Sequence, residues 1–207
     1  MPNGDADAWT GAPAGPASRE ASAAGGGAAE SAGRDLTRDR SGFRKSKLAF
    51  TVIGLIVVLD ILTKLWVVRT LTLHQPVPIL GEFFRLTYTY NPGAAFGINV
   101  GEHSRAFFLV LSVVALLVLG TIYRHTSASD RVRLLALSMV AGGALGNILD
   151  RIRYPQGVVD WLDVGLGSLR WPVFNVADMA VSTGAVLLLV SFYLEERHER
   201  REGEPDG

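Results

Sequence analysis

Four long apolar stretches restrict what this chain can fold into. A helix needs about 20 apolar residues to cross the hydrocarbon core of a bilayer, and four segments meet or approach that length: residues 48–68, 106–123, 134–149 and 173–194. Apolar residues that are gathered in such blocks are typical of membrane spans. The sequence therefore predicts a small membrane protein that crosses the bilayer four times.

The distribution of charge predicts how these spans are oriented. Basic residues precede the first span, fill the turn between the second and third, and follow the fourth. Cytoplasmic loops of membrane proteins carry an excess of Lys and Arg. Both termini are therefore expected in the cytoplasm, and the connections 70–105 and 152–172 are expected outside.

Composition excludes several classes of function. The net charge of the chain is zero, so nothing in the overall charge points to a nucleic-acid partner or an acidic substrate. The chain has no cysteine, which excludes disulfides, thiolate nucleophiles and cysteine-bound metals. Any catalysis has to use oxygen or nitrogen side chains.

The two ends of the chain are expected to lie outside the membrane domain. Residues 1–46 are rich in Ala, Gly, Ser, Asp and Arg, without an apolar period, and are predicted to form a disordered cytoplasmic tail. They lack the apolar core of a cleaved signal peptide, so the first span is expected to direct insertion. Residues 47–195 form the predicted membrane domain, and residues 196–207 a second cytoplasmic tail.

The outer connection after the first span has the pattern of a β-strand. Phe84, Leu86, Tyr88 and Tyr90 alternate with polar residues, which is the period of a half-buried strand. A small sheet on the outer membrane surface is therefore predicted. The strand ends at Asn91, where Pro and Gly force a turn. The Asn91 amide either caps this turn or points at a substrate backbone, and both interpretations stay open.

Charged groups also occur within the first span, where they are costly and usually functional. Asp60 and Lys64 are four residues apart, so they share one helix face and can neutralise each other. If that face points into the helix bundle, the pair would also orient other polar groups. The second interpretation is favoured because neutralisation alone leaves two costly groups near lipid.

The outer end of the third span carries a polar ladder. Gly143, Asn147, Asp150 and Arg151 recur at successive turns on roughly one helix face. Asp150 and Arg151 could be only a pair at the membrane interface. Asn147 lies deeper in the span and is expected to hold another group.

Two further aspartates come from the second half of the chain. Asp160 falls in a short outer connection, where an aspartate is normally only solvated. Asn175 and Asp178 resemble a helix cap, but if the fourth helix begins at Pro172, Asp178 lies about 9 Å along it and beyond the cap. Two aspartates brought together at the mouth of a membrane bundle suggest a carboxylate pair that shares one proton and activates water.

Together these motifs resemble the bacterial lipoprotein signal peptidase family, also called signal peptidase II. Five blocks carry the resemblance, in the expected order within four spans: residues 60–64, 91–96, 142–151, 159–160 and 174–178. The resemblance covers most of residues 47–194. It implies an all-α membrane protein with four transmembrane helices and a small extracytoplasmic β-sheet.

The resemblance also implies an activity and its residues. The activity is that of an aspartyl endopeptidase that removes the signal peptide from diacylglyceryl-modified prolipoproteins, just before the lipidated cysteine. The implied catalytic dyad is Asp160 and Asp178. The implied supporting and substrate-binding residues are Asp60, Lys64, Asn91, Gly143, Asn147, Asp150, Arg151 and Asn175.

No metal or other cofactor is expected for such a mechanism. The expected partners are the prolipoprotein substrate and membrane lipid, with the protein acting as a monomer. The expected location is the bacterial inner, or plasma, membrane, with the active site near the outer face.

Two other classes of function are compatible with some of these features. A small helical transporter could use the same acids as an ion or proton path, but the chain has no internal repeat and its acids gather at one membrane face. A structural scaffold with interfacial ion pairs is the third possibility. The Gly-x-Gly-Asp signature of presenilin-type proteases is absent, because Gly165-Leu166-Gly167 is followed by Ser168.

Overall fold

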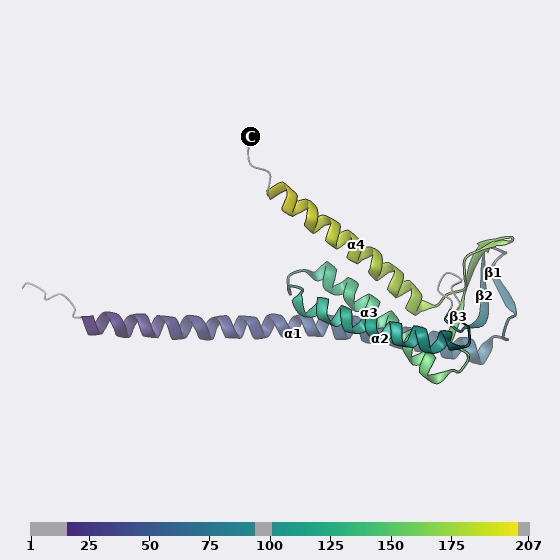
Figure 1. Cartoon of the computed structure of the whole chain (residues 1–207), viewed down its shortest axis with the longest axis horizontal. Coiled ribbons are helices and arrows are strands. Elements are labelled where there is room, and N and C mark those ends of the chain that lie inside the picture. Colours follow the sequence, from purple (N-terminus) through teal and green to yellow (C-terminus); the bar gives the residue numbers. More distant parts are fainter. Residues whose placement is uncertain (1–15, 94–100, 203–207) are drawn as a thin grey trace, which may run out of the picture. The chain divides into compact units, whose positions relative to one another are not determined.

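Four helices carry the predicted membrane spans. The computed structural model describes residues 16–93 and 101–202, with the helices α1 (Pro16–Thr70), α2 (Ser104–His125), α3 (Arg131–Arg153) and α4 (Val176–Glu202) (Figure 1). Each helix contains a segment that is long and apolar enough to cross a bilayer: Gly42–Thr70, the whole of α2, the whole of α3, and Val176–Arg197. The prediction of four spans is therefore confirmed.

Helix α1 begins well before the first predicted span. The chain divides into two compact units, Met1–Phe43 and Arg44–Gly207. Residues 16–43 of the first unit are helical, whereas composition predicted a disordered tail over residues 1–46. The segment is rich in alanine, the residue with the highest helix propensity, and the lack of an apolar period does not oppose a helix. Residues 1–15 lie outside the described part of the chain, and the domain boundaries stay predictions.

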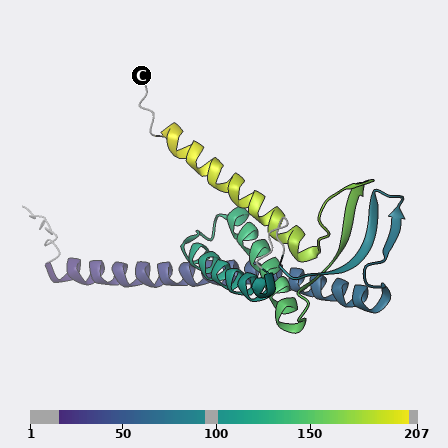
Figure 2. The same cartoon turned by 45° about the vertical axis from the view of Figure 1, so that its right-hand side comes forward.

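A four-stranded antiparallel sheet connects the helices at one end. Its strands follow the order β1 (Pro76–Leu80), β2 (Phe84–Asn91), β3 (Val158–Leu166) and β4 (Leu169–Arg170), and they lie together beside the last turns of α1 (Figure 2). The predicted strand is β2, so the expectation of a small sheet is confirmed. Strand β3 was not predicted, because that connection was interpreted as a loop.

Charged residues tie the two hairpins of the sheet together. Asp163 on β3 is 2% exposed and accepts hydrogen bonds from Arg85 and Thr87 of β2 and from Arg170 of β4. Burial would raise the pKa of Asp163, but these hydrogen bonds together hold it below its ordinary value. The network fixes the register of β3, the strand that carries Asp160.

The fourth helix begins later than the sequence predicted. Residue 172 was expected in its first turn, but α4 begins at Val176. Phe174, two residues before the start of the helix, is held in an extended conformation beside β3. The Phe174 backbone N–H donates to the Leu162 carbonyl at 3.0 Å, and the Phe174 carbonyl accepts from the Leu162 N–H at 2.8 Å. These bonds keep the segment before Val176 out of the helix.

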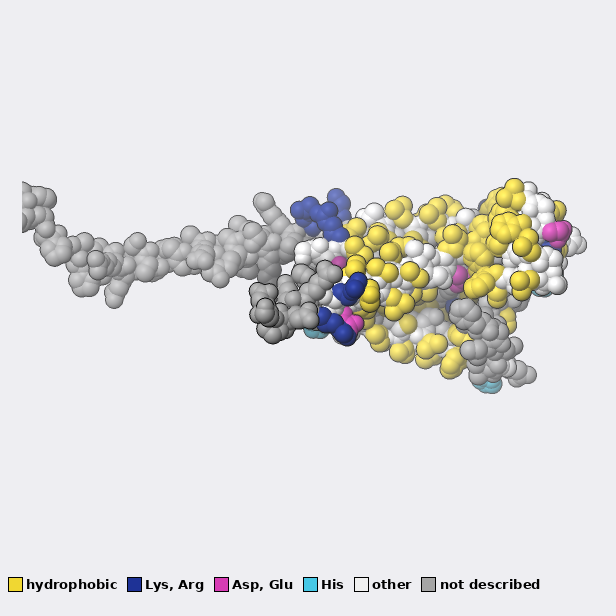
Figure 3. Space-filling view, turned by 90° about the horizontal axis from the view of Figure 1, so that it is seen from above, with side chains coloured by type: hydrophobic (Ala, Val, Ile, Leu, Met, Phe, Trp, Pro, Cys, Tyr) yellow, Lys and Arg dark blue, Asp and Glu magenta, His cyan; other side chains and the backbone are white. Residues whose placement is uncertain are grey.

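The outer surface of the helices is apolar. Large side chains such as Leu117 and Leu189 are 69% and 70% exposed, and Figure 3 shows a broad hydrophobic surface with Lys and Arg side chains gathered at one end of it. A helix with exposed apolar side chains is typical of a membrane span. Basic residues at one end agree with the predicted orientation, which stays a prediction.

Helix α3 packs closely against its neighbours because glycines line its contacts. A Cβ at Gly142 would lie 3.1 Å from the Ile56 side chain of α1. A Cβ at Gly143 would meet the backbone of α4. Small residues of this kind let helices approach closely in lipid. The close approach brings polar residues from α1, α3 and α4 to one place, next to the sheet.

Candidate active site

Asp160 lies on β3 and is almost completely buried. The residue is 1% exposed, and its register partner on β2 is Thr89. Its carboxylate Oδ1 accepts a hydrogen bond of 2.7 Å from the Asn175 side-chain amide, and the Asn91 side chain also hydrogen-bonds it. The expectation of a loop position is wrong, since the backbone of Asp160 is held within a sheet, where a side chain is placed more rigidly than in a loop.

Asp178 lies in the first turn of α4, three residues after Asn175. The Asp178 backbone N–H donates to Asn175 Oδ1 at 2.9 Å, and the Asn175 backbone N–H donates to Asp178 Oδ2 at 3.1 Å. This reciprocal arrangement is a capping box, which satisfies two N–H groups at the helix terminus. The capping interpretation is therefore right. The expectation that Asp178 lies beyond the cap is wrong, because α4 begins at Val176.

Capping uses only one oxygen of the Asp178 carboxylate. The other oxygen, Oδ1, accepts a hydrogen bond of 2.8 Å from the side-chain Nδ2 of Asn147 on α3. Both oxygens are thus held, one from within α4 and one from α3. This fixes the direction in which the half-buried carboxylate points.

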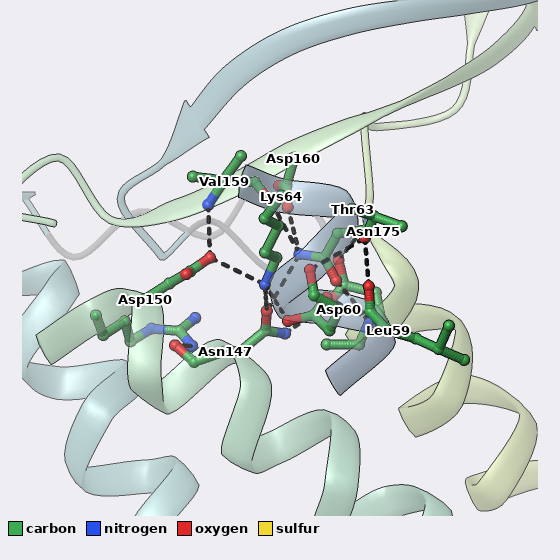
Figure 4. A network of polar contacts seen from close by, with 12 residues as sticks. Leu59, Asp60, Thr63, Lys64, Asn147, Asp150, Val159, Asp160 and Asn175 are labelled. Carbon is green, nitrogen blue, oxygen red and sulfur yellow. Dashed lines mark hydrogen bonds and ion pairs between the residues drawn. The ribbon is translucent and has the colours of Figure 1, made fainter. Parts of the chain in front are cut away.

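Two asparagines join Asp160 and Asp178 into one network, and Figure 4 shows Asn147, Asn175 and Asp160 within it. Asn175 donates to Asp160 through its side chain and to Asp178 through its backbone. Asn147 Oδ1 accepts from Asn175 Nδ2 and from Lys64 Nζ, both at 3.1 Å. Because its oxygen is taken by two donors, the Asn147 amide presents its Nδ2 to Asp178. The expectation that Asn147 holds another group is therefore confirmed in the geometry.

Asp60, Lys64 and Asp150 form a buried group of ion pairs beside this network. Lys64 Nζ lies 2.7 Å from Asp60 Oδ2 and 2.9 Å from Asp150 Oδ2. Asp60 is 0% exposed and Lys64 is 3% exposed, so the pair faces the interior. Both interpretations of the pair hold, since the two charges neutralise each other and also bind further polar groups.

Gly143 contributes through packing. A Cβ at this position would meet the Ala177 carbonyl oxygen and would lie 2.7 Å from Val181 Cγ2, both on α4. At Gly146, a Cβ would lie 2.6 Å from Asp60 Oδ2. The absence of side chains at these two positions lets α3 approach the start of α4 and leaves room for the Asp60 carboxylate.

The environment of Asp160 favours its protonated form. Burial, and after it the negative charge of the nearby Asp178 carboxylate, raise the pKa of Asp160 to about 7. Hydrogen bonds from Asn91 and Asn175 act in the opposite direction and offset only part of this effect. A carboxyl group with such a pKa can exchange a proton near neutral pH, which is the requirement for general acid–base chemistry.

A cavity of about 540 Å³ opens beside the network. Its polar wall includes Asn91, Arg151 and Asp178, whereas Asp160 does not line it. The remaining wall is largely apolar and consists of Gly93, Trp171, Pro172, Val173, Phe174, Met179, Val181, Ser182 and Thr183. A largely apolar cavity of this size with a few polar groups is typical of a ligand-binding site.

Arg151 stands at this cavity with an incompletely paired guanidinium. Its Nη1 donates to the Asn147 carbonyl at 3.3 Å, and its Nε has no hydrogen-bond partner among the described residues. Arg151 is 9% exposed, and a buried donor without a partner is costly. Asp150 is more than half of an interfacial pair with Arg151, because it binds Lys64. The role of Arg151 stays a prediction.

Asn91 ends β2 at the edge of the cavity. Its Oδ1 accepts from the Gly93 N–H at 2.9 Å, so the turn-capping interpretation is confirmed. Because the same residue lines the cavity, its position also suits the second interpretation, an amide aimed at a substrate, which stays a prediction. The following motif residues 94–96 lie outside the described part of the chain.

The structure brings together every predicted site residue that it describes, and it adds two backbone groups. The Val159 N–H donates to Asp150 Oδ2, and the Ala177 N–H donates to Asp60 Oδ1, each at 3.0 Å. Val159 directly precedes Asp160, and Ala177 directly precedes Asp178. Sequence reasoning missed them because a backbone donor has no residue-type signal.

Comparisons with known proteins identify the relatives of this chain. The sequence profile of the family described as signal peptidase (SPase) II matches residues 52–194. Curated relatives named lipoprotein signal peptidase include one from Syntrophotalea carbinolica, 40% identical over 70% of this chain and 90% of its own length. Another, from Cupriavidus necator, is 44% identical over 71% of this chain and 82% of its own length.

Solved structures share the fold. One described as a bacterial membrane enzyme determined by the in meso method at 2.3 Å resolution has a TM-score of 0.65, covers 77% of this chain and 93% of its own, and is 24% identical. A second with the same description, at 1.9 Å resolution, has a TM-score of 0.61, covers 70% of this chain and 91% of its own, and is 26% identical.

Proposed function

Because this chain belongs to the signal peptidase II family, we propose that it cleaves the signal peptide from diacylglyceryl-modified prolipoproteins, just before the lipidated cysteine. The chain is a membrane-spanning peptidase of the aspartic type. The observation that carries the proposal is the network through which Asn175 binds Asp160 and Asp178 at once, beside a cavity large enough for a peptide.

The two carboxylates divide the acid and base roles. Asp160 has the raised pKa and serves as the acid, while Asp178, which lines the cavity, serves as the base. Asp178 takes a proton from water, and the water oxygen bonds to the scissile carbonyl carbon. Asp160 donates its proton to the developing oxyanion. When the C–N bond breaks, the proton held by Asp178 passes to the leaving amine, and one hydroxyl proton of the intermediate returns to Asp160, which leaves the carboxylic acid product and restores the dyad.

The substrate is held by groups at the rim of the cavity. Arg151 offers side-chain donors to peptide carbonyls, and the sheet with the Asn91 turn clamps the peptide near its lipidated cysteine. The apolar part of the wall, which includes Trp171 and Met179, suits the apolar signal segment. A crosslinker placed at Tyr90 captures the substrate if this clamp exists.

The site lies at the outer face of the plasma membrane, with both termini in the cytoplasm. Asp150 is near the end of α3 and Asp178 is near the start of α4, whereas the basic residues Arg131 and Arg197 lie at the opposite ends of these helices. The positive-inside rule assigns the basic ends to the cytoplasm. A dyad near the outer surface meets the cleavage point without lifting the acyl chains into water, and the protein acts as a monomer.

The family does not support the alternative of a transporter. The geometry gives an independent reason, because Asp60, Asp150 and Asp178 converge at one end of the spans instead of forming a path across them.

The substrate assignment is tested with purified protein and matched precursors. Wild type is incubated with one prolipoprotein in diacylglyceryl-modified and unmodified forms, and the products are identified by mass spectrometry. We expect cleavage of the modified form alone, directly before the lipidated cysteine. Asp130→Asn serves as the control, because Asp130 caps α3 away from the site and Asn also caps helices well. Cleavage at another bond, or equal cleavage of both forms, would contradict the proposal.

A further inference from the structure

The ammonium group of Lys64 is surrounded by three protein oxygens. It has three N–H donors, and it contacts Asp60 Oδ2 at 2.7 Å, Asp150 Oδ2 at 2.9 Å and Asn147 Oδ1 at 3.1 Å. The lysine is 3% exposed. Lys64 is not among the residues that line the cavity, so its effect on the site passes through these three partners.

The first partner reaches the chain that carries Asp178. Asp60 binds Lys64 with Oδ2, and its Oδ1 accepts from the Ala177 backbone N–H at 3.0 Å. Ala177 directly precedes Asp178 and is itself 0% exposed. The position of the Asp60 carboxylate therefore sets the position of the first turn of α4.

The second partner reaches the chain that carries Asp160. Asp150 Oδ2 binds Lys64 and also accepts from the Val159 backbone N–H at 3.0 Å. Val159 directly precedes Asp160 on β3 and is 0% exposed. The same ammonium thus holds the backbone beside each aspartate of the dyad, one on a helix and one on a strand.

The third partner acts on a catalytic side chain directly. Asn147 accepts from Lys64 with its Oδ1, so its Nδ2 is presented to Asp178 Oδ1 at 2.8 Å. Without a cation, a flipped amide would place an oxygen against the Asp178 carboxylate. Lys64, together with the Asn175 side chain that donates to the same oxygen, therefore also selects which way this amide points.

We propose that Lys64 is a positioning residue, which sets the two catalytic carboxylates in one relative position through three arms that start at Asp60, Asp150 and Asn147. The inference rests on the proposed function for the roles of Asp160 and Asp178. A lysine suits this role because its ammonium is a compact charge with three diverging donors, whereas an arginine presents a planar fork. It also separates two carboxylates that would otherwise repel each other within the protein.

Hydrogen exchange tests the arms without reference to activity. In Lys64→Met, the Val159 and Ala177 amides should exchange at least about tenfold faster than in wild type, because the carboxylates that bind them lose their common anchor. Thr63→Val is the matched control on the same helix, since among the described residues the Thr63 hydroxyl bonds only the carbonyls of Leu59 and Asp60. Unchanged exchange of both amides in Lys64→Met would overturn the inference.

Kinetics separate positioning from substrate binding. A misplacement of about 1 Å can cost about 100-fold in rate, so Lys64→Met should lower kcat by about that factor while KM stays within about threefold of wild type. Lys64→Arg should restore little of the lost kcat, because the planar fork of arginine does not replace three diverging donors. A raised KM with unchanged kcat would instead make Lys64 a substrate ligand and would overturn the inference.

A pair of substitutions at Asp150 keeps the test decisive even if Lys64→Met does not fold. Asp150→Asn retains an oxygen that can accept from both Lys64 and Val159, whereas Asp150→Leu removes it. We expect kcat within about tenfold of wild type for the first and about 100-fold lower for the second. Equal losses would overturn the inference. If wild type cleaves no prolipoprotein but Lys64→Met still loosens both amides, the proposed function fails and the positioning role of Lys64 stands.

Discussion

The carboxyl group of Asp160 combines a functional advantage with a cost in stability. It is 1% exposed, and its ionised form is penalised by burial and by the neighbouring Asp178 charge. A proton held at this position near neutral pH serves acid catalysis. When Asp160 loses this proton, its buried negative charge beside Asp178 destabilises the folded protein.

This cost predicts a pH-dependent effect of Asp160→Asn on stability. The pKa of Asp160 is about 7 in the folded protein and about 3.9 in an unfolded chain. The folded protein therefore binds more protons between these values, and the contribution of Asp160 to the free energy of unfolding is complete below pH about 4 and is lost as the pH rises towards 7. Asparagine cannot ionise and avoids this loss.

Thermal unfolding in detergent checks the sign. Relative to wild type, Asp160→Asn should gain more stability at pH 8 than at pH 5, by a difference on the order of 2 kcal/mol. Asp130→Asn, which changes a carboxylate outside the site, should show no such difference. An equal effect of Asp160→Asn at both pH values would show that Asp160 is not protonated in the folded protein.

At the scale of elements, the site depends on how closely α3 approaches the start of α4. Gly143 faces the Ala177 carbonyl, and the capping box of Asn175 and Asp178 begins α4 at that level. A helix that begins elsewhere would carry Asp178 away from Asn147. The exact start of α4 is therefore a functional feature, although capping boxes are usually discussed only for stability.

Gly143→Ala tests this dependence. The added Cβ meets backbone and cannot be accommodated by a side-chain rotation, so we expect a loss of about 1–3 kcal/mol in the free energy of unfolding and a marked loss of turnover. Gly54→Ala is the matched control, because Gly54 is helical and a Cβ there would meet nothing within 4 Å. It should be neutral or slightly stabilising. Equal stability and activity of the two variants would contradict this account of the packing.

Elements that follow from local pattern could be predicted, and those set by distant contacts could not. The four spans and β2 follow from apolar length and from alternation. Strand β3 was missed because Asp160 and Asp163 look like loop residues until their buried partners Asn175 and Arg85 are known. The start of α4 was misplaced because backbone bonds between Phe174 and Leu162 override the preference of proline for a first turn.

The candidate site shows the same division. Its residues could be named from motifs, because charged groups within apolar spans are conspicuous. Their contacts could not, since the bonds from Asp60 to Ala177 and from Asp150 to Val159 join residues far apart in sequence through backbone groups. The sequence thus predicts which side chains gather but not which one positions the others.

At the scale of the whole membrane unit, one end of the sheet exposes large apolar side chains. Asp163 is buried and bound by Arg85 and Arg170, while Leu80, Phe83, Leu166 and Leu169 are 50–81% exposed. The two hairpin ends that carry these side chains are adjacent, because Phe84 pairs with Val164. A sheet end built in this way suits contact with lipid, as expected for a sheet that lies on the membrane surface.

A single fluorescent label measures this contact. The chain has no cysteine, so Leu169→Cys can be labelled at one position with a polarity-sensitive dye. In lipid nanodiscs the emission should be shifted to the blue, as in an apolar environment, and lipids that carry a quencher should reduce it. The same label at Ser168→Cys, next to it in the hairpin turn, provides the comparison. Water-like emission from position 169 that lipid quenchers leave unchanged would contradict the predicted location.

The central claim is that Asp160 and Asp178 act as one catalytic unit. The most direct measurement is single-turnover cleavage of a diacylglyceryl prolipoprotein by wild type, Asp160→Asn, Asp178→Asn and the double variant, each shown to be folded and to bind the substrate. Residues that act as a unit have strongly non-additive effects, so each single change should abolish turnover as completely as both together. Turnover that persists in either single variant, or losses that add in the double variant, would contradict the account.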